Sequence, residues 1–295
     1  MVASSAVEIA LVQVPYDSGQ YGARMGRGPL HLLERGLDRD LERSGHVVHR
    51  AEVALPAGFH TEIGAAAALY RLVRQAVTEA RRAARLPIVL SGNCNLAALG
   101  TVAALGGAST AVVWLDAHGD FNTPETSPSG FFDGMALSVL TGGSWETLAA
   151  ALPGFAPVPE DQVLLVGARD LDLAERELLA GSAVTQLSAE ALRGEGGLEA
   201  RLAAHLDRLA GKVERAYLHV DLDVLDPEES RANPYAAAGG LRLAEALELV
   251  QAVAEKLPLA AAALTSLDPT ADPADRATAA AKRLVLAVAE AAAAS

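Results

Sequence analysis

The stretch AVVWLDAHGD, residues 111–120, consists of five apolar residues followed directly by a cluster of two aspartates and a histidine. The stretch AYLHVDLDVLD, residues 216–226, has a similar arrangement. Short runs rich in β-branched and aromatic residues predict buried strands. Alternate residues of a strand point to the same face, so we expect the first aspartate of each cluster to share a direction with the residue two positions later. The sequence therefore predicts acidic groups and one imidazole that converge where two strands end.

The candidate metal ligands in these clusters are Asp116, His118, Asp120, Asp221 and Asp223. Four carboxylates brought together repel one another unless cations neutralise them. Carboxylates with one imidazole suit a hard or borderline divalent ion, Mn²⁺ above all, and shared carboxylates can bridge more than one ion. Aspartates at strand ends also cap helices and turns. Two such clusters, one of them with a histidine, favour the metal site over that structural role.

Strand-like and helix-like patterns alternate along the whole chain, which predicts an α/β fold with a parallel sheet covered on both faces. The predicted strands are Val7–Val14, Val47–Val53, Ile88–Ser91, Ala111–Asp116, Gln162–Val166, Val184–Leu187, Ala216–Asp221 and Ala261–Leu267. The predicted helices are Pro29–Arg43, Ile63–Ala84, Leu96–Ala104, Met135–Ala151, Gly197–Leu209, Leu241–Leu257 and Ala274–Ala293. No Pro- or Ser-rich linker interrupts the alternation, so we expect a single domain over residues 1–295. In such sheets ligands bind at the carboxyl ends of the strands, where both clusters fall.

Composition excludes several classes of partner. The 295 residues carry a formal net charge of −13, which argues against binding to nucleic acid or to an anionic membrane surface. The single cysteine excludes an intrachain disulfide and fits a reducing cytoplasm. The first residues lack the basic segment of a secretion signal, and no apolar run is long enough to cross a bilayer. We therefore expect a cytoplasmic protein that acts on a small molecule.

Several motifs along the chain resemble those of the arginase/agmatinase (ureohydrolase) family. The resemblance lies in DAHGDFNTPETSPSG at 116–130, DLDVLDP at 221–227, PYDSGQ at 15–20 with Gly28-Pro29, GGL at 239–241 and LDP at 267–269. It implies a three-layer α/β/α sandwich with a parallel sheet of about eight strands. It also implies hydrolysis of a guanidino or related C–N bond by a hydroxide between two Mn²⁺ ions. Relatives are often trimers or hexamers, so a homo-oligomer is implied as well.

The resemblance also implies roles for individual residues. Asp116 and Asp221 would bridge the two metals, and Asp120 would complete the first site together with a residue from Ser91–Asn95. His118 and Asp223 would complete the second site. For an amino-acid substrate, the positions that bind the α-carboxylate are Asn122, Ser127 and Ser129, and those near the α-ammonium are Asp172 and Glu175. Ordinary turn and cap chemistry explains any one of these last five equally well.

Four departures from the family pattern fall at the reacting end of the site. Cys94 stands in the slot of a metal-ligand histidine, and Asn93 replaces a neighbouring aspartate. A thiolate is softer than imidazole, so we expect the first metal site to bind Mn²⁺ more weakly. Asp133 replaces a histidine that shuttles protons, and we expect it to take part in catalysis with Asp120. Ser266 replaces a glutamate that pairs with the guanidinium, which removes charge-assisted hydrogen bonds.

These departures spare the amino-acid end of the site and change the end where the bond breaks. They resemble the Nω-hydroxy-L-arginine amidinohydrolases of D-cycloserine biosynthesis, which carry a cysteine in the same slot and form hydroxyurea and L-ornithine. An N-hydroxyguanidino group is less basic than guanidine and needs an anionic partner less. Two alternatives remain open: hydrolysis of arginine or another guanidino acid, and a non-catalytic relative that binds an amino acid. His31, His46, His49, His60 and His205 have no motif around them, and His219 stays unassigned.

Overall fold

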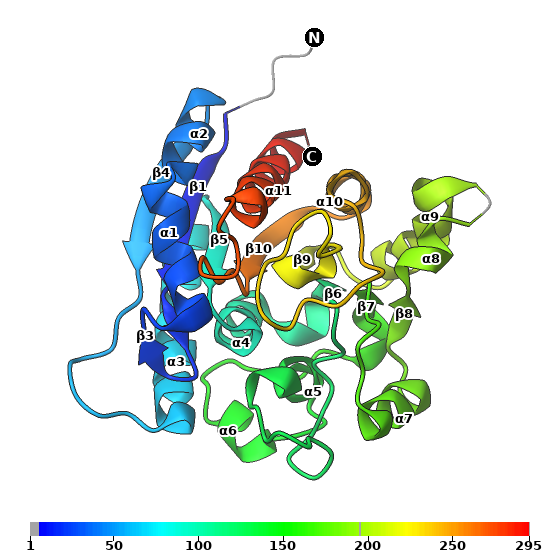
Figure 1. The fold of residues 1–295 in the computed structure, drawn as a ribbon, viewed down its shortest axis with the longest axis horizontal. Helices are drawn as coiled ribbons and strands as arrows, with labels where there is room; N and C mark the ends of the chain where they lie inside the picture. The colour runs from blue at the N-terminus through cyan, green and yellow to red at the C-terminus, as the bar shows by residue number, and fades with distance from the viewer. Residues whose placement is uncertain (1–5, 195, 295) are drawn as a thin grey trace.

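In the computed structural model, which describes residues 6–194 and 196–294, eight parallel strands form one sheet (Figure 1). Their spatial order is β4-β1-β5-β10-β9-β6-β7-β8. The strands are β1 (Glu8–Val14), β4 (Val47–Glu52), β5 (Leu86–Ser91), β6 (Ala111–Leu115), β7 (Val163–Val166), β8 (Thr185–Leu187), β9 (Ala216–Asp221) and β10 (Leu259–Thr265). A short antiparallel pair, β2 (Tyr16–Asp17) and β3 (Gln20–Tyr21), lies outside the sheet. The predicted parallel sheet of about eight strands is confirmed.

Helices cover both faces of the sheet, and each face has its own hydrophobic core. One layer contains α1 (Gly28–Glu34), α2 (Leu37–Arg43), α8 (Ala189–Leu192), α9 (Gly197–Ala210), α10 (Leu243–Lys256) and α11 (Arg276–Ala294). The other contains α3 (Glu62–Arg82), α4 (Cys94–Leu105), α5 (Ala136–Thr141), α6 (Glu146–Ala150) and α7 (Leu173–Gly181). In β6, Val113 packs into the first core and Trp114 into the second, as the two-residue period of a strand requires. The predicted three-layer arrangement is confirmed.

Two of the predicted helices were wrong in extent because glycines interrupt them. The predicted helix Pro29–Arg43 is divided into α1 and α2 at Gly36, which has a φ of 78°. The predicted helix Met135–Ala151 is divided into α5 and α6 after Gly142, which has a φ of 83°. A left-handed residue ends an α-helix, and glycine adopts that conformation without steric cost. Helices α7 and α8 were not predicted from the sequence. Among the described residues, no helix combines the length and apolar character needed to cross a membrane.

The carboxyl ends of the central strands β5, β10, β9, β6 and β7 meet along one edge of the sheet. The segments that follow these strands begin at Gly92, Ser266, Leu222, Asp116 and Gly167. Chain segments from five separate parts of the sequence are therefore brought side by side. This is the edge at which open α/β sheets bind their ligands.

Candidate active site

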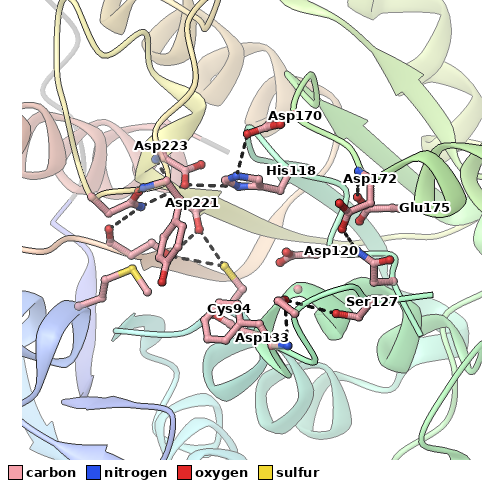
Figure 2. A pocket seen from close by; sticks show the side chains of 18 of the residues that line it. Cys94, His118, Asp120, Ser127, Asp133, Asp170, Asp172, Glu175, Asp221 and Asp223 are labelled. Atoms are coloured by element: carbon pink, nitrogen blue, oxygen red, sulfur yellow. Dashed lines mark hydrogen bonds and ion pairs between the residues drawn. The ribbon is translucent and has the colours of Figure 1, made fainter. Parts of the chain in front are cut away.

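A cavity of about 680 Å³ opens at this edge of the sheet (Figure 2). Its walls include most of the predicted site residues, namely Cys94, His118, Asp120, Asn122, Ser127, Ser129, Asp133, Asp172, Glu175, Asp221 and Asp223. Asp116 is 1% exposed and lies behind this wall, in contact with His118. The fold thus gathers around one cavity all the residues to which the resemblance gave a role. Their individual roles stay predictions.

Two groups of side chains in this region have the geometry to hold a metal ion. In the first, ligand atoms of Cys94, Asp116 and Asp221 all lie within 4.8 Å of one another. In the second, the same holds for Asp116, His118 and Asp223. Asp116 belongs to both groups, so a carboxylate common to two adjacent sites is present in the structure. Asp221 belongs to the first group only, and Asp120 lines the cavity outside both groups.

The local cause of this convergence differs from the strand alternation that the sequence suggested. Strand β6 ends at Leu115, before the first aspartate of its cluster. The Asp116 carboxylate then accepts a hydrogen bond from the backbone N–H of His118 at 2.8 Å. In the same way, the Asp221 carboxylate accepts one from the N–H of Asp223 at 2.9 Å. Turns closed by an aspartate side chain, rather than extended backbone, direct the later residue of each cluster back toward the first.

Buried negative charge dominates the electrostatics of the cavity. Burial, followed by the charge of Asp223, raises the pKa of Asp116, and burial raises the pKa of Asp221 well above its usual range. Burial alone would lower the pKa of His118, but the charges of Asp223 and Asp116 outweigh it and raise that pKa to about 10. Among the described residues that line the cavity, eight are acidic and none is lysine or arginine. Among the described lining residues, the imidazole of His118 is therefore the one group that can carry a positive charge against these eight carboxyl groups.

These observations fit a divalent metal ion. The Oδ2 atom of Asp120 is buried and has no hydrogen-bond partner, a costly situation that a cation would relieve. The backbone at Asp120 has a φ of 49°, in the left-handed region that is uncommon for residues other than glycine. The donor set contains carboxylate oxygens, one imidazole nitrogen and one sulfur, all of which are metal ligands in proteins. The residues present therefore suit the binuclear centre of the family to which the resemblance points.

Cys94 is the first residue of α4, and its side chain is 2% exposed. Its sulfur lies 3.0 Å from Oδ2 of Asp221, and burial raises the pKa of the thiol well above its usual range. Gly92 lets the preceding turn approach Tyr16, because a Cβ atom at position 92 would lie 2.3 Å from the Tyr16 carbonyl oxygen. Close packing of this turn therefore helps to fix where α4 starts.

Asp133 lies in the wall of the cavity and caps the helix that starts at Cys94. Its two carboxylate oxygens accept hydrogen bonds from the backbone N–H groups of Cys94 at 3.0 Å and Asn95 at 2.8 Å. Burial raises the pKa of Asp133 to about 7. Asp133 therefore has an observed structural role, while its predicted part in proton transfer stays a prediction.

The residues predicted for the amino-acid end of the substrate all line the cavity, and Ser127, Asp172 and Glu175 lie to one side of Cys94 in Figure 2. The Asn122 amide donates to Asp172 at 3.0 Å. Asp172 caps α7 in a capping box with Glu175, whose other carboxylate oxygen accepts from the N–H of Phe121 at 2.9 Å. The Ser127 and Ser129 hydroxyl oxygens lie 3.5 Å apart. Each accepts a backbone N–H, from Gly130 and Phe131 respectively. One hydroxyl hydrogen can join the two serines, which leaves the other free to donate to a carboxylate.

Several residues that shape the cavity were missed from the sequence. Asn233 is buried and donates to Oδ2 of Asp223 at 3.0 Å and to the carbonyl of Ser266 at 3.0 Å. Tyr235 and Phe131 stack with their ring centroids 6.0 Å apart and both line the cavity. Nothing in the local sequence around Asn233 or Tyr235 indicated a role, because their partners are distant in the chain. Only the long segment between Asp226 and Gly239, which has no helix or strand, could have suggested a functional loop.

An acidic cavity at the carboxyl edge of a parallel sheet, with two metal-binding groups that share one carboxylate, is typical of α/β metallohydrolases. The arginase family model matches residues 7–290, and the chain therefore belongs to the arginase family. Members of this family are metal-dependent hydrolases of guanidino C–N bonds with a binuclear metal centre. The chain is accordingly an arginase-family ureohydrolase that acts on guanidino compounds.

Individual relatives agree with this assignment. The chain is 30% identical over 277 residues to an arginase of Brevibacillus brevis, covering 90% of this chain and 91% of the relative. It is 32% identical over 218 residues to the N(omega)-hydroxy-L-arginine amidinohydrolase of Streptomyces lavendulae, covering 74% and 69% of the two chains. The crystal structure of arginase from Bacillus cereus superposes with a TM-score of 0.85 at 25% identity, covering 95% and 98% of the two chains.

Proposed function

We propose that the protein hydrolyses the guanidino C–N bond of Nω-hydroxy-L-arginine to give hydroxyurea and L-ornithine. The observation that carries the proposal is the pair Cys94 and Ser266 at the reacting end of the cavity. The Ser266 hydroxyl lies 3.7 Å from the Cys94 sulfur and also contacts Oδ2 of Asp221. A neutral hydroxyl at this position offers no charge-assisted hydrogen bond to a strongly basic guanidinium. A less basic N-hydroxyguanidino group suits it better.

Two divalent ions, Mn²⁺ by the hardness of most of the ligands, are proposed to occupy the two groups of side chains. Cys94, Asp116, Asp120 and Asp221 would hold the first ion, and Asp116, His118, Asp221 and Asp223 the second. Bound divalent ions lower the pKa of coordinated water to near neutrality and so supply a nucleophile for C–N hydrolysis. The sulfur of Cys94 makes the first site the softer of the two, and we expect it to be the weaker one for Mn²⁺.

The remaining predicted residues bind the substrate or transfer protons, and these roles do not require a metal ligand. Ser127 and Ser129, with Asn122, anchor the α-carboxylate of the substrate: one serine hydroxyl can donate to the other, and the second keeps its hydrogen for the carboxylate. Asp172, supported by Glu175, holds the α-ammonium group. Asp120, with one buried unpaired oxygen, accepts the proton from the attacking water. Asp133, whose pKa is raised to about 7, gives its own proton to the departing ornithine nitrogen, and both carboxyl groups then exchange protons with solvent.

Arginine is the second candidate substrate, because several relatives with about 30% identity are arginases. A substrate panel distinguishes the two. The Mn²⁺-loaded protein is incubated with Nω-hydroxy-L-arginine, L-arginine and agmatine, and ornithine, hydroxyurea and urea are quantified. We expect kcat/KM for the hydroxylated substrate to exceed that for arginine, and agmatine, which lacks the α-carboxylate, to be the poorest. A higher kcat/KM for arginine would refute the proposal and leave the family assignment intact.

A further inference from the structure

A row of buried polar side chains leads away from the cavity behind the Cys94 sulfur. The Thr265 hydroxyl oxygen lies 3.2 Å from this sulfur and 3.3 Å from Nε2 of His219. The other ring nitrogen of His219, Nδ1, lies 2.8 Å from the hydroxyl of Tyr217. Thr265, His219 and Tyr217 are all 0% exposed. None of them lines the cavity, so none can contact a substrate there.

The sheet explains how these residues come together. Tyr217 and His219 are two positions apart on β9 and therefore point to the same face. Thr265 ends the neighbouring strand β10, where it pairs with Asp221. On the other side, the His219 ring stacks on Trp114 of β6, with ring centroids 3.7 Å apart and an interplanar angle of 8°.

The stacked rings of Trp114 and His219 are linked by hydrogen bonds to two of the three residues of the first metal group, Asp116 and Cys94. The indole N–H of Trp114 donates to Oδ2 of Asp116 at 3.0 Å. The His219 ring reaches Cys94 through the Thr265 hydroxyl. Both rings are fully buried and lie between strands, so the stack is a rigid support for the two ligands.

The direction of the hydrogen bonds follows from counting donors. A fully buried imidazole is neutral and carries one N–H. If Nδ1 carried it, the buried hydroxyl hydrogen of Tyr217 would have no acceptor in this row, which is costly. With the hydrogen on Nε2, the Tyr217 hydroxyl donates to Nδ1, and Nε2–H donates to the Thr265 oxygen. The hydroxyl hydrogen of Thr265 then has two acceptors within reach, the Cys94 sulfur at 3.2 Å and the backbone carbonyl of Val220 at 3.4 Å. The sulfur is the nearer of the two and, as a thiolate, the charged one, so it is the stronger acceptor.

We propose that His219 and Thr265 are positioning residues for the sulfur ligand of the first metal site, because they direct the Thr265 hydroxyl hydrogen at Cys94. This inference rests on the proposed role of Cys94 as a metal ligand. A metal-bound cysteine is a thiolate. A hydrogen bond donated to its sulfur holds the side chain in one orientation and so fixes where the sulfur lies relative to the metal. The same donor offsets part of the repulsion between the thiolate and the Asp221 carboxylate 3.0 Å away.

The test uses the full-length protein loaded with Co²⁺, because a thiolate bound to Co²⁺ gives charge-transfer absorption in the near ultraviolet. This absorption reports on the sulfur site alone and does not depend on activity. Thr265→Val replaces the hydroxyl with a methyl group of similar size, and Thr265→Ser retains the hydroxyl. Thr101→Val is the matched control, since Thr101 is also 0% exposed but its hydroxyl donates to the helical carbonyl of Ala97.

We expect Thr265→Val to weaken Co²⁺ binding at the sulfur site by about tenfold, the lower end of effects seen for residues that support metal ligands, and to shift the absorption band. Thr265→Ser should restore both, and Thr101→Val should change neither. If Thr265→Val bound Co²⁺ with unchanged affinity and an unchanged band, Thr265 would not position the Cys94 sulfur. The proposed role of Cys94 as a metal ligand would not be affected by that result. A band that persisted in Cys94→Ser would instead overturn the role of Cys94 itself. Should Thr265→Val fail to fold, Tyr217→Phe tests the same row, with a shifted band expected and an unchanged band contradicting it.

Discussion

Arg169 offers a quantitative test of how the loop that carries Asp223 is held. Its guanidinium donates to the carbonyl oxygens of Gly167 and Asp223, both at 2.9 Å, and to those of Ala237 and Ala238 at 2.7 and 3.2 Å. Arg169→Met keeps the apolar part of the side chain and removes all these donors. The carbonyls of Gly167 and Asp223 belong to buried residues and cannot regain full hydration, whereas Ala238 is exposed.

Two lost hydrogen bonds from a charged donor, at about 1.5 kcal/mol each, give a loss of about 3 kcal/mol in the free energy of unfolding. Urea unfolding of the metal-free protein measures this loss. Arg50→Met is the control, because Arg50 pairs with Asp38 at the surface and its side chain is 59% exposed; we expect a change below about 0.5 kcal/mol there. If Arg169→Met lowered the free energy of unfolding no more than this control does, the guanidinium would not be what holds the loop that carries Asp223.

Three further predictions concern the metal, the turn before Cys94 and the substrate. Mn²⁺ at one hundred times its dissociation constant should stabilise the protein by about 2.7 kcal/mol per ion, which corresponds to a rise in melting temperature of about 4 °C; calorimetry that showed no rise would contradict metal binding. Gly92→Ala should destabilise the protein by about 2 kcal/mol or more, because its Cβ would lie 2.3 Å from the Tyr16 carbonyl oxygen; unchanged urea unfolding would mean that the turn shifts freely. Cys94→His should raise arginine turnover and lower Nω-hydroxy-L-arginine turnover, changing the ratio of the two kcat/KM values by about tenfold; a ratio that stayed the same would remove Cys94 from substrate selection.

The sequence was sufficient to predict the strands and to predict that acidic residues gather at one edge of the sheet. Leu115 and Val220 belong to apolar runs that are buried in the sheet, and the aspartates that follow them lie where parallel strands must place them. Helix ends were harder to predict. The apolar period continues across Gly36 and Gly142, so periodicity joined helices that left-handed glycines separate.

The residues that support the proposed metal ligands could not be predicted from the sequence. Trp114, His219 and Thr265 lie on three strands that are far apart in the chain and adjacent in the sheet. In the sequence, His219 is one polar residue within an apolar strand, and this pattern does not indicate which residue it contacts. Its stacking on Trp114 follows only from the register of β6 and β9, which pairs these two residues directly.

The central claim is that acidic side chains from separate strand ends hold two divalent ions, with Asp116 common to both. Calorimetric titration of the metal-free protein with Mn²⁺, alongside Asp116→Asn, tests it most directly, with Asp207→Asn as a control at an exposed ion pair with Lys256. We expect two ions per chain in the wild type and in the control. Asp116→Asn should weaken both binding events. Two ions bound with unchanged affinity in Asp116→Asn, or none bound by the wild type, would contradict the central claim.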